Sequence, residues 1–242
     1  MTKAIEPADR GYAIPMTALS SALSVPFRVG SALRGARVFH PRGATFEGVA
    51  ELESSWWPRQ IPRPTPVVAR VSRAIGTPDG MPDVLGLAVR FATKTGPWDV
   101  LLASAHLPAR VALLPARSWS SARYSTLMAY RTDSDPAPRW IPAVPRGRQP
   151  SSTTSVQALE IPLEFSLLVG SARGPLEAAG RLTLTRHLPE KDSEQPSFDP
   201  TVHCPGFVDP WPGWLVETRR DAYRASRAGR GAFLARPQHT VS

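Results

Sequence analysis

Apolar residues along this chain fall into short runs that end at glycine, proline or aspartate. Four runs have the length and the alternating or β-branched character of strands: residues 44–52, 66–74, 85–93 and 98–105. Two longer runs, residues 156–169 and 179–187, predict a hairpin around the glycines at 170–174. Several short strands at this spacing indicate an antiparallel sheet or barrel.

Helical spacing is confined to three stretches. Residues 16–33 predict one or two short helices broken by proline and glycine, residues 118–131 predict another, and residues 214–230 predict an amphipathic closing helix. Residues 132–154 predict a long surface loop, and residues 189–213 predict irregular structure because they are rich in proline.

These patterns together predict the α+β class. We expect an N-terminal arm and short helix over residues 1–30, followed by a single domain over residues 31–242 that is closed by the C-terminal helix. A chain of 242 residues is long enough to bury a sizeable core.

Composition and charge limit the kinds of molecule that this chain is expected to bind. The net charge is +9, and only three of the 29 basic residues are lysines. The arginines are scattered without a basic run, which argues against a nucleic-acid module. Because arginine binds carboxylate groups in a bidentate fashion, small anions or the carboxylates of a cofactor are the better match.

The cysteine and histidine positions limit the disulfides and metal sites that are expected. Cys204 is the only cysteine, so no disulfide within the chain and no cysteine-based metal cage is expected. A zinc site is not expected either, because His187 and His203 belong to separate elements.

No apolar run approaches the length of a membrane span and the N-terminus lacks a signal pattern, so we expect a cytoplasmic protein.

The first candidate for chemistry is His40, which lies in the run Arg37-Val38-Phe39-His40-Pro41-Arg42-Gly43. A histidine in such an apolar run is more often a core residue than a catalytic one. In the predicted strand at 66–74, Arg70 and Ser72 point to the same side. If both point inward, the arginine needs an anion, and the serine can fix the tautomer of a histidine such as His40.

The second candidate lies on the last predicted helix. Arg219, Tyr223, Arg227 and Arg230 are spaced so that they share one helix face. A guanidinium one turn before a tyrosine favours the phenolate, which is a hard ligand suited to ferric iron and an axial ligand known in haem proteins. Taken alone, this helix is better explained by a packed tyrosine with solvated arginines.

The order of the motifs resembles the haem catalase family, and in particular its short catalase-related branch. The chain carries Arg37-x-x-His40-x-x-Gly43, then Ala69-Arg70-x-Ser72, then the two strand motifs at residues 86–91 and 96–99, and finally Arg219-x-x-x-Tyr223. The stretch Ser197-Phe198-Asp199-Pro200-Thr201 and Pro205-Gly206 also resemble that branch. The resemblance covers roughly residues 30–105 and 196–231.

The resemblance implies a catalase-like antiparallel β-barrel, covered by helices, that binds haem b. It assigns His40 as the distal base, Ser72 as the residue that orients it, and Tyr223 as the iron ligand held as phenolate by Arg219. The propionates would pair with three arginines, namely Arg37, Arg70 and Arg230. Gly43 and Gly48 would keep side chains away from the haem.

The chain departs from the family pattern at several places. Where the family carries a distal asparagine this chain has Ala103, and Ser104 replaces it only if the strand slips by one residue. Phenylalanines near the family's haem are replaced by Val71 and, in a second place, by Ala116. Phe39 stands where the family prefers a small branched residue.

These features predict a haem-dependent oxidoreductase that uses peroxide or an organic hydroperoxide on a small organic substrate, with weak or no catalase activity. Two alternatives are a haem-binding or sensing protein without efficient turnover and a true minimal catalase. A third is a thiolate haem protein that uses Cys204. A homodimer is the expected assembly.

Overall fold

The described part of the chain forms ten strands and two short 3-10 turns. The computed structural model describes residues 42–147, 149–150, 152–153, 155–189, 196–200 and 202–213. The strands are β1 (Arg42–Leu52), β2 (Thr65–Arg73), β3 (Leu85–Phe91), β4 (Trp98–Ser104), β5 (Tyr124–Ser125), β6 (Ala129–Thr132), β7 (Pro142–Arg146), β8 (Leu163–Val169), β9 (Glu177–Leu188) and β10 (Val208–Trp211). The 3-10 turns are η1 (Leu107–Ala109) and η2 (Val156–Ala158).

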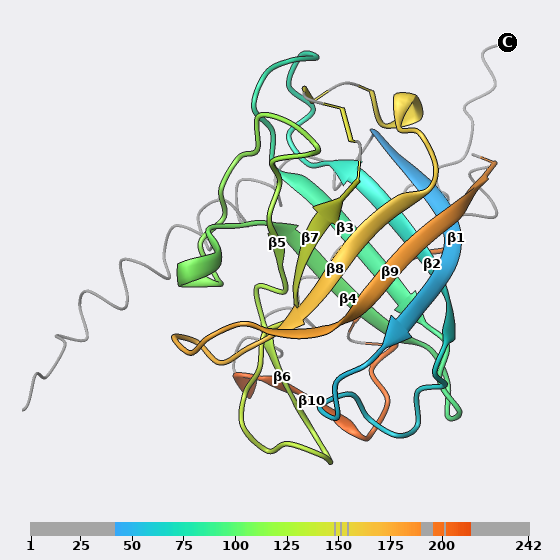
Figure 1. Ribbon diagram of the computed structural model, residues 1–242, viewed down its shortest axis with the longest axis vertical. Helices are drawn as coiled ribbons and strands as arrows, with labels where there is room; N and C mark the ends of the chain where they lie inside the picture. Colours follow the sequence, from blue (N-terminus) through green and yellow to red (C-terminus); the bar gives the residue numbers. More distant parts are fainter. Residues whose placement is uncertain are drawn as a thin grey trace, which may run out of the picture.

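Eight of these strands close into an antiparallel barrel in the order β1-β2-β3-β4-β5-β7-β8-β9, and β9 pairs back onto β1. In Figure 1, β8 and β9 cross in front while β2, β3 and β4 form the wall behind them. The remaining pair, β6 and β10, forms a small sheet below the barrel.

Alternating side chains fill the barrel interior. Buried apolar residues recur at every second position of β1 to β4 and of β8, for example Val67, Ala69 and Val71 on β2. An eight-stranded barrel is just wide enough for side chains to fill it. A large ligand therefore has no room inside this barrel, and any site for one must lie on its outer face or at an end.

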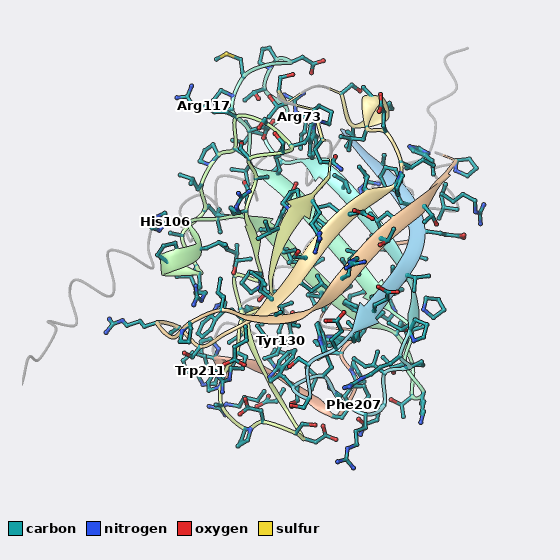
Figure 2. The ribbon with its side chains drawn as sticks, in the orientation of Figure 1. Arg73, His106, Arg117, Tyr130, Phe207 and Trp211 are labelled. Carbon is teal, nitrogen blue, oxygen red and sulfur yellow. The ribbon has the colours of Figure 1, made fainter. Side chains whose placement is uncertain are left out.

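The two ends of the barrel are closed in different ways. At the lower end of Figure 2, Tyr130 of β6 packs edge to face against Trp98 at a ring separation of 5.3 Å. At the upper end Arg73, fully buried, lies 3.4 Å from the carboxylate of Asp83 and 2.5 Å from that of Asp79. Asp83 also accepts hydrogen bonds from three successive backbone amides, Ile75 to Thr77.

The α+β class predicted from the sequence is wrong. Within the described residues the barrel is all-β, and η1 and η2 are the only helical turns apart from the boundary residue Gly213. The helix predicted over 118–131 is instead a turn followed by β5 and β6. Strand pairing explains the difference, because Tyr124 and Ser125 are paired with β4 and β7 and their backbone groups are not available for helical hydrogen bonding.

The predicted strands agree better with the structure. The four runs between residues 44 and 105 correspond to β1 to β4, and the hairpin is confirmed as β8 and β9. Its first strand starts later than predicted, since residues 156–158 form η2, and β7 and β10 lie in stretches predicted to be irregular. The predicted helices at 16–33 and 214–230 lie outside the described residues. No helix in the described part of the chain is long and apolar enough to span a bilayer.

Burial of Tyr124 makes a pH dependence testable. Its side chain lies in the barrel interior against Phe165, and this burial raises the pKa of the phenol well above 10. Below pH 10 both the folded and the unfolded chain keep the proton. This residue therefore does not contribute to the pH dependence of the free energy of unfolding in that range. Above pH 10 the unfolded chain loses the proton first, and stability should fall by about 1.4 kcal/mol per pH unit until the folded pKa is reached.

The measurement is urea unfolding of wild type and Tyr124→Phe between pH 8 and pH 11. The lysines titrate in both proteins, so the difference between the two curves isolates Tyr124. Parallel curves above pH 10 would show that Tyr124 titrates normally in the folded protein.

Candidate functional site

A row of small side chains crosses the outer face of the barrel. The strand pairings place Gly43, Ser72, Gly86, Ala103 and Ser125 opposite one another on β1 to β5. Directly opposed residues in a sheet point to the same face, and the intervening residues of these strands point into the apolar core. We call these five residues the small-residue row. Since none of their side chains is larger than serine, this strip of the outer face is shallow.

A second row lies beside the first and carries Arg70. Here Thr45, Arg70, Ala88 and Leu101 are paired across β1 to β4. The guanidinium of Arg70 extends toward the small-residue row, because a Cβ built on Gly43 would lie 2.7 Å from its Nε atom. Gly43 therefore provides the space in which the Arg70 side chain lies.

Two buried hydroxyl groups on this face have no hydrogen-bond partner among the described residues. They are Thr45 Oγ1, on a residue that is 1% exposed, and Ser125 Oγ, on a residue that is 0% exposed. An unsatisfied buried polar group costs about 1–3 kcal/mol, so native proteins usually supply a partner. A ligand bound on this face is one such partner.

A third row on the same face contains Arg90 of β3, which pairs with Asp99 of β4. These two residues anchor a distant segment of the chain to the barrel. Asp99 on β4 is fully buried and accepts two hydrogen bonds of 2.7 Å from Arg90 on β3. Its carboxylate also accepts from the backbone amide of Asp199 at 2.7 Å and lies 2.9 Å from Nδ1 of His203. We call these four residues the Arg90–Asp99 network.

The Arg90–Asp99 network is reinforced by backbone and aromatic contacts. Arg90 donates to the carbonyl of Ser197 at 2.7 Å, and its guanidinium lies 5.2 Å from the ring centre of Phe198. The hydrogen bond to Asp99 raises the pKa of Arg90, so the guanidinium stays charged at neutral pH. The network thus fixes residues 197–200 and 202–203, which precede the predicted Tyr223 helix, against β3 and β4.

The structure brings together some of the residues predicted for the site. Arg70 and Ser72 lie on the same face of β2, as the strand period predicted, but this face is the outside of the barrel. His40, Arg37, Arg219, Tyr223 and Arg230 lie outside the described residues, so their predicted roles remain predictions.

The register of β4 shows whether Ser104 or Ala103 lies on the outer face. Ala103 pairs with Gly86 and Ser125 on the outer face. Ser104 points the other way, where its hydroxyl accepts from the amide of Leu85 at 3.1 Å and donates to the carbonyl of Leu114 at 2.8 Å. The strand has not slipped, and Ser104 does not replace an asparagine at position 103.

Three other positions have roles that the sequence did not indicate. Val71 points into the barrel core, on the side opposite Arg70 and Ser72. Ala116 is buried in the hydrophobic core, where its backbone forms a bridge with Asp83. At Gly48 a Cβ would lie 2.0 Å from the carbonyl oxygen of Thr183, so this glycine permits the close pairing of β1 with β9.

Cys204 and the metal question were also left open by the sequence. The Cys204 thiol is half-buried against the hydrophobic core and lies 3.7 Å from the carbonyl oxygen of Val208. This is the environment of a packed structural thiol. The described residues contain no cluster of three or more histidine, cysteine or acidic side chains arranged to hold a metal ion.

Sequence reasoning missed Thr45, Ser125 and the Arg90–Asp99 network. Thr45 has the same strand period as Gly43, so the alternation of β1 offered a signal for it. Ser125 offered none, because its place beside Ala103 depends on a pairing between β4 and the two-residue strand β5. In the sequence, Arg90 and Asp99 were identified only as parts of the two strand motifs at residues 86–91 and 96–99.

The outer face fits a flat ligand that carries acidic groups. The small-residue row carries only short side chains, Arg70 supplies a guanidinium for a carboxylate, and two hydroxyls have no partner among the described residues. Haem b, a planar ring with two propionates, meets these requirements.

Comparison with known proteins supports the fold. No family model matches this chain, and no curated protein matches it significantly. Among solved structures it is similar to catalase A from Saccharomyces cerevisiae, with a TM-score of 0.53 and 12% sequence identity. The similarity covers 93% of this chain and 67% of the yeast chain. At this identity the comparison establishes a catalase-like barrel and nothing about activity.

Proposed function

We propose that this protein is a haem-dependent oxidoreductase that uses peroxide or an organic hydroperoxide to oxidise a small organic substrate. The observation that carries the proposal is the small-residue row beside Arg70, with two unpartnered buried hydroxyls, on the outer face of a catalase-like barrel. We place the haem on this face because the interior is filled by side chains.

Residues of this chain would hold the cofactor from both sides. Arg70, with Arg37 and Arg230, would neutralise the propionates, which is needed because buried carboxylates without a counter-charge are costly. Tyr223 would bind the iron as a phenolate, with Arg219 one turn earlier on the predicted helix favouring the deprotonated form. Bound haem b supplies the iron that exchanges electrons with peroxide.

The remaining chemistry belongs to His40 and Ser72. His40 would accept the peroxide proton at one ring nitrogen and return it to the departing oxygen. Ser72, on the small-residue row, would hold the other nitrogen and so fix the tautomer. At Ala103 no amide is available to orient hydrogen peroxide, and the space left there suits a substrate with a larger substituent.

The absorption spectrum of the purified full chain supplied with haem tests the proposal. We expect a Soret band, loss of most haem binding in Tyr223→Phe, and an unchanged spectrum in the control Tyr12→Phe, which removes a hydroxyl from the predicted arm. A protein without a Soret band would refute the proposal. A carbon monoxide difference spectrum with a thiolate-type band would assign the iron to Cys204 instead.

A haem-binding protein with little turnover is the second candidate, and the missing amide at Ala103 favours it. His40→Ala distinguishes the two. For the enzyme, this variant should keep its Soret band and lose peroxide-dependent oxidation of an organic dye by at least about 100-fold, the usual range for a general base. Equal dye oxidation by wild type and variant would favour the binding protein. Slow oxygen release on adding hydrogen peroxide is expected in either case.

A further inference from the structure

Ser125 is placed beside the position where the family's distal amide is missing. It pairs directly with Ala103, so the two Cβ atoms lie roughly 5 Å apart on the same face. The preceding residue, Tyr124, points into the barrel and contacts Phe165 at a ring separation of 5.9 Å. Because side chains alternate along a strand, Ser125 points outward, onto the small-residue row.

The hydroxyl of Ser125 is buried and available to form a hydrogen bond with a ligand. Ser125 is completely buried, and its Oγ atom has no hydrogen-bond partner among the described residues. Ser104, on the neighbouring strand, shows the contrast, since its hydroxyl is satisfied on the inner side by Leu85 and Leu114. A serine hydroxyl both donates and accepts, which suits the oxygen atoms of a peroxide or of a bound anion.

We propose that Ser125 is a specificity residue, whose hydroxyl hydrogen-bonds the oxygen of the small ligand bound on this face, in place of the amide absent at Ala103. This inference rests on the proposed haem function. The polar side chain then comes from β5 instead of β4, while β3 and β4 contribute only Gly86 and Ala103 beside it.

Azide binding to the ferric haem-loaded protein tests the inference with a readout other than turnover. We expect Ser125→Ala to raise the azide dissociation constant about 3- to 10-fold, the equivalent of one hydrogen bond. The matched control is Ser166→Ala, which removes a serine from β8, where its side chain is half-buried on a different part of the barrel. Its azide affinity should equal that of wild type.

Unfolding of the haem-free chain gives a second readout. Removing an unpartnered buried hydroxyl relieves a cost, so the urea midpoint of Ser125→Ala should equal or exceed that of wild type. Ser104→Ala, which removes two hydrogen bonds, should lower the midpoint.

The possible results distinguish failure of the proposed role of Ser125 from failure of the proposed haem function. A Soret band with weaker azide binding in Ser125→Ala alone supports the inference. A Soret band with equal azide affinity in Ser125→Ala and wild type, or a lowered haem-free midpoint in this variant, overturns the role of Ser125 and leaves the proposed function standing. Absence of a Soret band overturns the proposed function and this inference with it.

Discussion

Asp99→Ala is expected to lower the free energy of unfolding by about 3–5 kcal/mol. The wild-type carboxylate is fully buried and receives hydrogen bonds from Arg90 and from the backbone of Asp199, with His203 at 2.9 Å. Removing it leaves the Arg90 guanidinium beside β4 without its counter-charge. The loss should be large because the remaining charge is partly shielded from water.

Urea unfolding of the full chain at neutral pH measures this loss. The control is Asp209→Ala, whose carboxylate is exposed and lies 3.8 Å from Arg131, so its removal should cost less than about 1 kcal/mol. Similar losses in the two variants would show that the Arg90–Asp99 network contributes no more than a surface ion pair.

The same variant links the fold to the proposed function. The Arg90–Asp99 network fixes residues 197–200 and 202–203 on the barrel, and the predicted Tyr223 follows them in the chain. We expect Asp99→Ala to bind haem more weakly than wild type under conditions where both are folded, and Asp209→Ala to bind it normally. Equal haem affinity in all three proteins would show that the network positions only the segment itself.

Gly48→Ala is expected to destabilise the barrel by about 3 kcal/mol or more, at or above the upper end of the usual cost of overpacking. The new Cβ would lie 2.0 Å from the carbonyl oxygen of Thr183 and 2.8 Å from the Cα of Leu184. Both are backbone atoms of β9, so no side chain can move aside. The register between β1 and β9 shifts at this point, and β1 must separate from β9 to make room.

Thermal unfolding and amide hydrogen exchange test this prediction. We expect a lower Tm and faster exchange of the amides between β1 and β9 than between β2 and β3. The control is Gly206→Ala, where an added Cβ would meet nothing within 4 Å and the backbone needs no positive φ. A Tm for Gly48→Ala equal to that of Gly206→Ala would mean that the contact is relieved without opening the barrel.

Local pattern was sufficient to find most of the barrel. The periods of residues 44–105 predicted β1 to β4, because each of these strands alternates between the core and the outer face. The same period placed Arg70 and Ser72 on one side of β2. It did not show whether that side faced inward, since the wall of a closed barrel is largely buried on both faces here.

The helix predicted at 118–131 failed for a non-local reason. Tyr124 and Ser125 find their backbone partners on β4 and β7. Two residues do not make a strand by propensity alone, and their strand conformation depends on neighbours far along the chain.

The sequence by itself determined which residue types are available on this barrel: alternating apolar residues for the core, small residues and an arginine for one face, and a histidine and a tyrosine whose arrangement resembles the catalases. Only the tertiary structure decided that Gly43, Ser72, Gly86, Ala103 and Ser125 form one row, and that Ser104 cannot substitute at position 103. The physical reason is register. Hydrogen bonding between strands distant in sequence fixes which side chains lie opposite each other, and a shift of one residue would turn each of them to the other face.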